Sequence, residues 1–256
     1  MSSILTCQDV SIHFGGVKAV QNVSLEIQKG SVTSIIGPNG AGKTTFFNII
    51  SGVYKPTSGK VLLDGEDITS LPQHEVSRKG MARTFQNIRL FSQLDNVRNV
   101  QSALDARANY TMVEAILGLP RKRREDKKNY EIAMECLELV GLKEFAHDRP
   151  GNLPYGMQRK VELARALASN PKLLLLDEPA AGLNPVEVED FIDLLKKIRE
   201  IRDLTILLIE HRLKVVNTLS DEVFVLNFGE LLTHGTPEEV QNHPKVIEAY
   251  MGEEEE

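Results

Sequence analysis

The chain has 256 residues, of which 41% are hydrophobic and 26% charged, proportions that are typical of a globular protein with a substantial core. A formal net charge of −6 argues against a dedicated nucleic-acid-binding protein. No apolar run approaches the roughly 20 residues that span a bilayer. The N-terminus lacks a signal-peptide pattern, and two isolated cysteines indicate reduced thiols in a cytosolic protein.

The first predicted elements are two strands of a hairpin. Residues 4–13 and 18–27 alternate between apolar and polar side chains, as half-buried strands do, and an FGG turn from Phe14 to Gly16 separates them. Phe14 has two interpretations: a core residue of the hairpin, or an aromatic platform on which a nucleotide base stacks. The residues by themselves favour neither.

A phosphate-binding loop follows the next predicted strand, residues 31–36. The segment GPNGAGKTT fits the pattern G-x-x-x-x-G-K-[ST]. Its glycines allow backbone N–H groups to surround an anion, and a helix expected to start near Lys43 adds the positive end of its dipole. Lys43 would reach the β- and γ-phosphates, and the Thr44 hydroxyl would ligate Mg²⁺. The loop comprises Gly37, Pro38, Asn39, Gly40, Ala41, Gly42, Lys43, Thr44 and Thr45.

The middle of the chain changes from strand to helix patterns. A strand with an Asp64-Gly65 turn is predicted over residues 59–68, and a short strand that begins at Gly80 is expected to end at Gln86. From about residue 87 to 170, helical patterns dominate. The charged run 121–129 is interpreted as an exposed helix face, with a membrane-surface or RNA contact as the alternative. An apolar stripe at helical spacing is interpreted as core: Leu90, Phe91, Leu94, Val97 and Val100.

Acidic residues and a histidine follow buried strands in the last third of the chain. A helix is predicted from about Met157 to Ala168, and the apolar run 173–176 predicts a central strand of a parallel sheet. Asp177 and Glu178 at its carboxyl end are placed to hold Mg²⁺ and to orient or deprotonate an attacking water, respectively. The segment 203–211 predicts a second buried strand, with His211 just past its carboxyl end. A histidine there is either structural or, because another site lies at the same sheet edge, reaches a phosphate. A hairpin over 222–234 follows.

Together these motifs resemble the ATP-binding subunits of ABC transporters, over about residues 5–252. The matching segments are the Walker A loop at 37–45, a Q-loop at Gln86, a signature-like LPYGMQ at 153–158, a Walker B strand at 173–177 with Glu178, a D-loop at 180–184 and a switch histidine, His211. Phe14 stands at the position of the family's base-stacking aromatic residue. The resemblance implies an α/β fold: a P-loop NTPase (RecA-like) core with an antiparallel β subdomain and an inserted helical subdomain.

The resemblance also implies a division of the chain and a set of ligands. One ABC ATPase domain would occupy residues 1–256, with the catalytic core and β subdomain at 1–86 and 171–235, the helical subdomain at about 87–170, and C-terminal helices with an acidic tail at 236–256. ATP and Mg²⁺ would bind, with Lys43, Glu178 and His211 as catalytic residues. The metal would be held by Thr44, Gln86 and Asp177.

Two such subunits would sandwich two ATP molecules, and ATP would close the dimer until hydrolysis reopens it. The residues expected to face the partner's ATP are the signature residues Pro154, Tyr155, Gly156, Met157 and Gln158, accompanied by the D-loop residues Gly182, Leu183 and Asn184. Further expected partners are two membrane permeases and, indirectly, a periplasmic or extracellular solute-binding protein, but no nucleic acid. The chain would lie on the cytoplasmic side of the cell membrane as a peripheral subunit of a homo- or heterodimer.

A finer similarity is to the LivG type, the ATPase subunits of high-affinity branched-chain amino-acid importers. It is carried by residues 152–167, 177–185 and 208–212 and by the C-terminal segment 235–252. Alternatives are urea or amide import, lipopolysaccharide export, a soluble non-transport ABC ATPase and a nucleotide-binding module without hydrolysis. The chain departs from the general family pattern at Pro154, where a serine is usual, and at Asn184, where an aspartate is usual.

Overall fold

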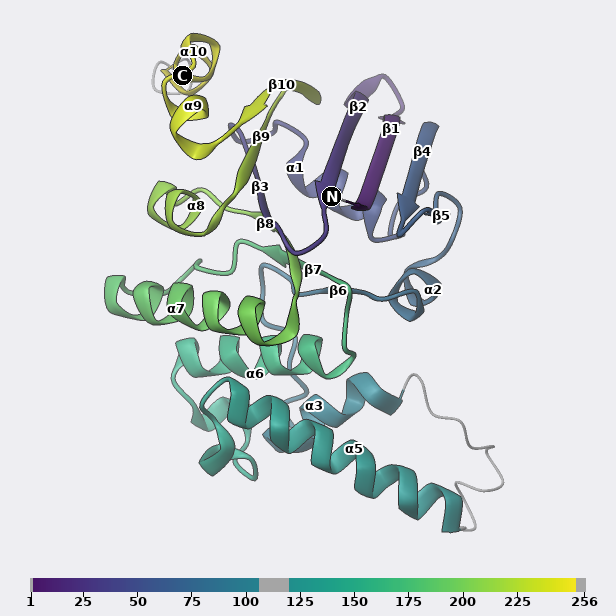
Figure 1. Cartoon of the computed structure of the whole chain (residues 1–256), viewed down its shortest axis with the longest axis vertical. Coiled ribbons are helices and arrows are strands. Elements are labelled where there is room, and N and C mark those ends of the chain that lie inside the picture. Colours follow the sequence, from purple (N-terminus) through teal and green to yellow (C-terminus); the bar gives the residue numbers. More distant parts are fainter. Residues whose placement is uncertain (1, 106–119, 252–256) are drawn as a thin grey trace.

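A six-stranded sheet lies at the centre of the computed structural model, which describes residues 2–105 and 120–251 (Figure 1). Its strand order is β10-β9-β3-β8-β7-β6, and all neighbours are parallel except β10 and β9. Every residue of β3, β7 and β8 is buried, as the apolar runs predict. The strands are β3 (Val32–Ile36), β6 (Met81–Arg83), β7 (Leu173–Asp177), β8 (Thr205–Ile209), β9 (Glu222–Asn227) and β10 (Glu230–Gly235).

A second, antiparallel sheet has the order β2-β1-β4-β5. Its strands are β1 (Ser3–Phe14), β2 (Val17–Gln28), β4 (Ser58–Leu63) and β5 (Glu66–Asp67). Between β4 and β5, Asp64 and Gly65 both have positive φ, so the predicted Asp-Gly turn is present. Helix α1 (Lys43–Ile50) packs between the two sheets through Phe46, Phe47 and Ile50, which are fully buried.

The central sheet separates two hydrophobic cores because side chains alternate along each strand. Leu173 and Leu175 of β7 face the core that contains α1 and the antiparallel sheet. Leu174 and Leu176 face the opposite core, which is formed with α7 (Pro185–Arg202) and with α3, α5 and α6. We call the last three the helical layer: α3 (Asn96–Asp105), α5 (Pro120–Leu139) and α6 (Tyr155–Ala168). Figure 1 shows this layer beyond α7, on the side away from the antiparallel sheet.

Short elements complete the fold. They are α2 (Gln73–Arg78), the 3₁₀ turns Lys143–Phe145 and Pro150–Asn152, α8 (Leu213–Leu219), α9 (Pro237–Gln241) and α10 (Pro244–Met251). Among the described residues, no helix is long and apolar enough to cross a membrane. Cys7 and Cys136 are buried and form no disulfide, and burial raises the pKa of the Cys7 thiol, which keeps it protonated. The predicted acidic tail lies outside the described residues.

Two local predictions were wrong. The strand expected to end at Gln86 ends at Arg83, and the apolar residues Leu90, Phe91 and Leu94 precede helix α3, which begins only at Asn96. In the second case, the segment before α3 is held by the buried side-chain amide of Asn99. Its Oδ1 accepts a hydrogen bond from the Phe91 N–H at 2.7 Å, and its Nδ2 donates to the carbonyls of residues 91, 94 and 95. These bonds give one N–H group and three carbonyls of this segment partners outside a helix.

Candidate functional site

The phosphate loop connects β3 to α1 and depends on glycine at two close approaches. Gly37 has φ 148° and Gly42 has φ 96°. A Cβ atom on Gly37 would lie 2.0 Å from the Leu226 carbonyl oxygen, and one on Gly42 would lie 2.5 Å from that of Ala19. The sequence pattern of the loop therefore reflects its packing against β9 and β2 as well as its ability to approach an anion.

Lys43 is folded back over this loop. Its side chain is 6% exposed, and its Nζ donates to the carbonyl oxygens of Gly37 at 2.6 Å and Pro38 at 2.7 Å. Helix α1 begins at Lys43 after Gly42, and no side chain caps it. The first N–H groups of the helix therefore point at the loop, where an anion would complete their hydrogen bonds.

A pocket of about 500 Å³ joins the loop to residues from distant parts of the chain. Glu178 and His211 line it although they follow different strands, β7 and β8, because parallel neighbours end at the same edge of the sheet. The other lining residues are Val17, Lys18, Ala19, Asn39, Gly40, Ala41, Gly42, Lys43, Thr44, Thr45, Phe228 and Gly229. We call this the phosphate-loop pocket.

The carboxylate of Glu178 is held from both sides. Gln86 Nε2 donates to Oε2 at 2.7 Å, and His211 Nε2 lies 2.9 Å from Oε1. Glu178 itself has φ 47°, a left-handed conformation that is uncommon for glutamate. Gln86 and His211, which lie 92 and 33 positions from Glu178 in the sequence, thus meet at its carboxylate beside the phosphate loop.

Asp177 ends β7 and is 4% exposed. Arg83 Nη2 donates to its Oδ2 at 2.8 Å, whereas no group in the described part of the chain donates to Oδ1. The Asp177 carboxylate and the hydroxyl of Thr44 are hard oxygen donors, which Mg²⁺ prefers when it also binds phosphate oxygens. Among the described residues, no group of three acidic, His or Cys side chains is arranged so that it could hold a metal ion by itself. The donor set therefore fits a metal that arrives with a phosphate ligand rather than an all-protein cage.

The signature-like segment lies elsewhere: none of the residues 154–158 lines the phosphate-loop pocket in the described structure. Helix α6 starts at Tyr155, two residues earlier than predicted, with Pro154 at the N-cap and no side-chain cap. The N–H groups of Met157 and Gln158 already donate to the Pro154 carbonyl. Those of Tyr155 and Gly156 have no acceptor among the described residues; Tyr155 is exposed, whereas Gly156 is buried.

The D-loop packs against this helix start. A Cβ atom on Gly182 would lie 2.8 Å from the Tyr155 ring, and one on Gly156 would lie 2.8 Å from Glu187 Oε1. Asn184 caps α7: its Oδ1 accepts from the N–H groups of Val186 and Glu187, both at 3.0 Å, and Glu187 accepts from the Asn184 N–H. The asparagine that departs from the family pattern therefore retains a structural role that aspartate would also serve. Leu183 is buried in the core.

Arg159, which no sequence motif singles out, connects α6 to the loop of Gln86. Its side chain is buried on α6 and donates to the carbonyl of Phe85 at 2.9 Å, to that of Gln86, and to the Tyr155 hydroxyl at 3.0 Å. One guanidinium thus links the helix that carries residues 154–158 to the loop that carries Gln86. No local pattern identifies it, because arginine is common on exposed helix faces.

Glu210, directly before His211, was also missed. It is 3% exposed and accepts hydrogen bonds from the N–H groups of Ala180 at 2.9 Å, His211 at 2.9 Å and Arg212 at 3.1 Å. It therefore fixes the backbone of the D-loop relative to the switch histidine. A charged residue at the end of the apolar run 206–209 was the available signal.

Phe14 does not line the phosphate-loop pocket. It ends β1 and packs edge-to-face against Tyr54, with ring centroids 5.4 Å apart. After the turn that follows, Val17 does line the pocket. Base stacking by Phe14 therefore stays a prediction.

Two family models match this chain. The ABC transporter model covers residues 20–181, and the model of the branched-chain amino acid ATP-binding cassette transporter covers residues 230–256. The high-affinity branched-chain amino acid transport ATP-binding protein BraF of Pseudomonas aeruginosa is 46% identical over 250 residues, which is 98% of each chain. The protein LivG of Salmonella typhimurium, described in the same words, is 43% identical over the same shares.

Solved structures agree with these matches. The ADP conformation of MJ1267, an ATP-binding cassette of an ABC transporter, superimposes with a TM-score of 0.86 at 31% identity, covering 98% of this chain and 100% of that one. The dimeric structure of MJ0796, a bacterial ABC transporter cassette, reaches 0.77 at 29% identity over 91% and 98% of the two chains.

Proposed function

The chain belongs to the ABC transporter family, and we propose that it binds and hydrolyses ATP to power the import of branched-chain amino acids. The substrate is supported by the two transport relatives, by their coverage of 98% of each chain, and by the C-terminal family match. These matches do not favour urea or amide import, lipopolysaccharide export, or a soluble non-transport ATPase.

The observation that carries the hydrolytic function is the Glu178 carboxylate, held between Gln86 and His211 in the wall of the phosphate-loop pocket. In this proposal Glu178 orients or deprotonates the attacking water, and His211 and Gln86 fix the carboxylate until the γ-phosphate arrives. Both contacts would rearrange on binding, since His211 and Gln86 then have phosphate and water as partners. A nucleotide-binding module without hydrolysis has no use for such an arrangement.

The phosphate loop would bind the triphosphate through its N–H groups and Lys43. Lys43 Nζ donates to the carbonyls of Gly37 and Pro38, and because an ammonium group has three N–H donors it can also donate to a phosphate oxygen. Thr44, Asp177 and Gln86 would hold Mg²⁺, which when bound neutralises charge on the phosphate oxygens. Phe14 would stack on the base.

The complete site would need a second ATPase subunit. Residues 154–158 do not line this chain's own phosphate-loop pocket, which supports the proposal that they bind the ATP of a partner subunit. The similar cassette MJ0796 is dimeric. We therefore place the chain in a homo- or heterodimer that sits as a peripheral subunit on the cytoplasmic side of the membrane, with two permeases and, through them, an external solute-binding protein. Within this dimer the helical block from about residue 87 to 170 would carry the signature.

Replacement of one side chain tests the hydrolytic role. Glu178→Gln keeps the size of the side chain but cannot accept a proton, so we expect unchanged ATP affinity, loss of turnover by about 10²–10⁴-fold, and accumulation of ATP-bound dimers. Phosphate release and size-exclusion chromatography measure these effects. The matched control is Glu189→Gln, which removes only a surface ion pair with Lys214. Steady-state hydrolysis retained by Glu178→Gln would contradict the proposal.

The substrate is tested separately. Two permease genes, a second ATPase gene and a gene for an amino-acid-binding protein next to this one would indicate an importer. In vesicles that contain the assembled complex, leucine with its binding protein should raise ATP hydrolysis, and urea should not. Stimulation by a non-amino-acid solute alone would overturn the substrate while leaving the ATPase in place.

A further inference from the structure

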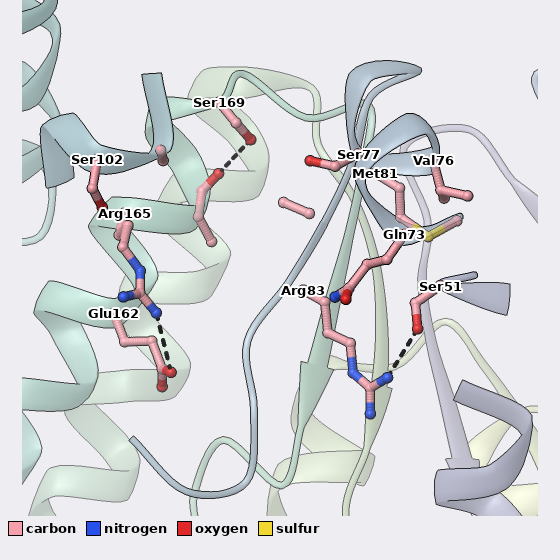
Figure 2. A pocket seen from close by; sticks show the side chains of 13 residues that line it. Ser51, Gln73, Val76, Ser77, Met81, Arg83, Ser102, Glu162, Arg165 and Ser169 are labelled. Carbon is pink, nitrogen blue, oxygen red and sulfur yellow. Dashed lines mark hydrogen bonds and ion pairs between the residues drawn. The ribbon is translucent and has the colours of Figure 1, made fainter. Parts of the chain in front are cut away.

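Arg83 occupies an unusual position for a charged residue. It is the last residue of β6, which lies at the edge of the central sheet, yet its side chain is only 5% exposed. It stands in the wall of a pocket of about 280 Å³ between α1, α2, β6 and the helical layer. Figure 2 shows Arg83 with Ser51 beside it, and Glu162 and Arg165 of α6 on the opposite side of the pocket.

The guanidinium bridges two parts of the nucleotide site. On one side Nη2 donates to Oδ2 of Asp177 at 2.8 Å. On the other, Nη1 donates to Oδ1 of Asn48 at 2.8 Å and to Oγ of Ser51 at 2.9 Å, at the end of the helix that begins with Lys43. Arg83 therefore joins the carboxylate at the end of β7 to the helix that follows the phosphate loop.

Two aromatic rings pack against the Arg83 guanidinium. Arg83 lies over the Phe47 ring at 5.6 Å and over the Phe85 ring at 5.2 Å, and Arg89 lies over that same Phe85 ring at 4.1 Å. The Arg83 Nε is buried and has no hydrogen-bond partner. Burial of this unpaired N–H group costs free energy, which the other contacts of the guanidinium offset. A side chain needed only for charge neutralisation would not need this geometry.

We propose that Arg83 is a positioning residue that orients Asp177 for Mg²⁺ and couples that carboxylate to the phosphate-loop helix. The inference deepens the proposed ATPase and rests on it. Arg83 holds Oδ2 and leaves Oδ1 as the oxygen available to the metal. It also keeps the carboxylate at a set distance from α1, because the same planar fork binds Asn48 and Ser51.

Metal affinity tests the inference without recourse to turnover. Mn²⁺, a paramagnetic substitute for Mg²⁺, is titrated into the full chain in the presence of a non-hydrolysable ATP analogue and followed by electron paramagnetic resonance. Arg83→Gln should weaken Mn²⁺ binding by about tenfold, the lower end of the usual effect of losing a residue that orients a metal ligand. Affinity for the analogue without metal should not change, because Arg83 does not line the phosphate-loop pocket.

A conservative variant separates positioning from charge. Arg83→Lys keeps the positive charge but loses the planar fork, so it should restore only part of the metal affinity. Full restoration by lysine would overturn the inference, since charge alone would then suffice. Unchanged Mn²⁺ binding by Arg83→Gln would overturn the inference too. So would tighter binding, because it would mean that Arg83 acts only as a positive charge whose removal strengthens the cation site.

Two further variants guard against misfolding and general effects. The double substitution Asn48→Ala with Ser51→Ala removes the contacts that hold Nη1 and keeps both buried charges, and it should weaken Mn²⁺ binding in the same direction by a smaller factor. The matched control is Arg199→Gln, which removes another arginine–aspartate pair, with Asp221, away from the pocket, and should leave metal affinity unchanged. Equal losses in this control and in Arg83→Gln would sink the inference.

The same titration distinguishes this inference from the function on which it rests. If the wild-type chain binds the analogue and Mn²⁺, and the Arg83 and Asn48 variants bind Mn²⁺ with the same affinity, only the role of Arg83 is overturned. A wild-type chain without metal-dependent nucleotide binding overturns both.

Discussion

At the scale of single residues, the site contains residues whose backbone conformation is unfavourable for an amino acid with a Cβ atom. Glu178 has φ 47°, and Phe228, at the rim of the same pocket, has φ 46°. A left-handed conformation costs a residue with a Cβ on the order of 1–2 kcal/mol. For Glu178 the turn directs the carboxylate to Gln86 and His211 instead of along the strand. Strain of this kind concentrates where a side chain must be aimed.

Phe228 offers a test of that cost. With Gly229 it forms a two-residue turn between β9 and β10 in which both residues have positive φ, and such turns favour asparagine at the first position. The Phe228 side chain is 83% exposed, so little packing would be lost. We expect Phe228→Asn to raise the free energy of unfolding by about 0.5–1 kcal/mol, measured by urea denaturation. Phe228→Ser, which lacks the turn preference, should gain less, and a less stable asparagine variant would refute this account.

At the scale of elements, buried or bridging charges join segments that hydrophobic packing alone would leave unaligned. Arg159 attaches α6 to the loop of Gln86, and Glu210 attaches the D-loop to the segment of His211. In the antiparallel sheet, Asp64 in the β4–β5 turn binds Lys29 after β2 and Lys172 before β7, both at 2.6 Å. This carboxylate thus ties the antiparallel sheet to the central one.

The Asp64 connection should depend on pH. Hydrogen bonds from Lys172, and secondly from Lys29, lower the pKa of Asp64 to about 2. Because the unfolded chain has the ordinary value of about 3.9 and binds the proton more readily, the contribution to stability is present above that pH and disappears as pH falls through about 2. Asp64→Asn keeps a residue that tolerates positive φ and removes the charge.

The urea midpoints of the wild type and of Asp64→Asn should therefore differ at pH 6, with the wild type more stable. They should converge as the pH is lowered from about 4. Lys29→Gln combined with Asp64→Asn should add little to the single change. A difference that persists unchanged down to pH 3 would show that the turn, not the ion pairs, is responsible.

At the scale of the whole molecule, the phosphate-loop pocket and residues 154–158 are separate surfaces of one chain. Pro154 at the N-cap of α6 supplies no side-chain hydrogen bond, and the N–H groups of Tyr155 and Gly156 have no acceptor among the described residues. We infer that closure of the dimer relies on the backbone at this helix start and is weaker than with a serine there.

Pro154→Ser tests this at the level of assembly. In a Glu178→Gln background, the serine hydroxyl should tighten ATP-dependent dimerisation by about 0.5–1.5 kcal/mol per site, the range for one added hydrogen bond. It should also cap α6 and add about 1 kcal/mol to the stability of the monomer. Pro154→Ala is the matched control, since it removes the ring without adding a hydroxyl. Sedimentation in the presence of ATP measures the dimer, and equal dimerisation of all three proteins would exclude the role given to Pro154.

Local chemistry in the sequence already determines much of this protein. The glycines of residues 37–45, the Asp64-Gly65 turn and the apolar runs at 173–176 and 206–209 each require a particular backbone or environment, so the phosphate loop, the hairpin and the buried strands could be predicted. The spacing of apolar residues was less informative before α3, where hydrogen bonds of a side-chain amide hold a segment that is not helical. The Asn99 amide forms hydrogen bonds with the N–H and the carbonyl of Phe91, and the spacing of apolar residues does not indicate these bonds.

Only the tertiary structure decided which distant residues meet. Arg83 and Asp177 are 94 positions apart, and they touch because the sheet places β6 beside β7 although a helical layer separates them in the chain. The same holds for Arg159 with the Gln86 loop and for Glu210 with the D-loop. Buried ion pairs and hydrogen bonds between elements depend on strand order and helix packing, and neither leaves a periodic pattern in the sequence. The sequence therefore suggested candidate site residues one by one, whereas the contacts between them came from the tertiary structure.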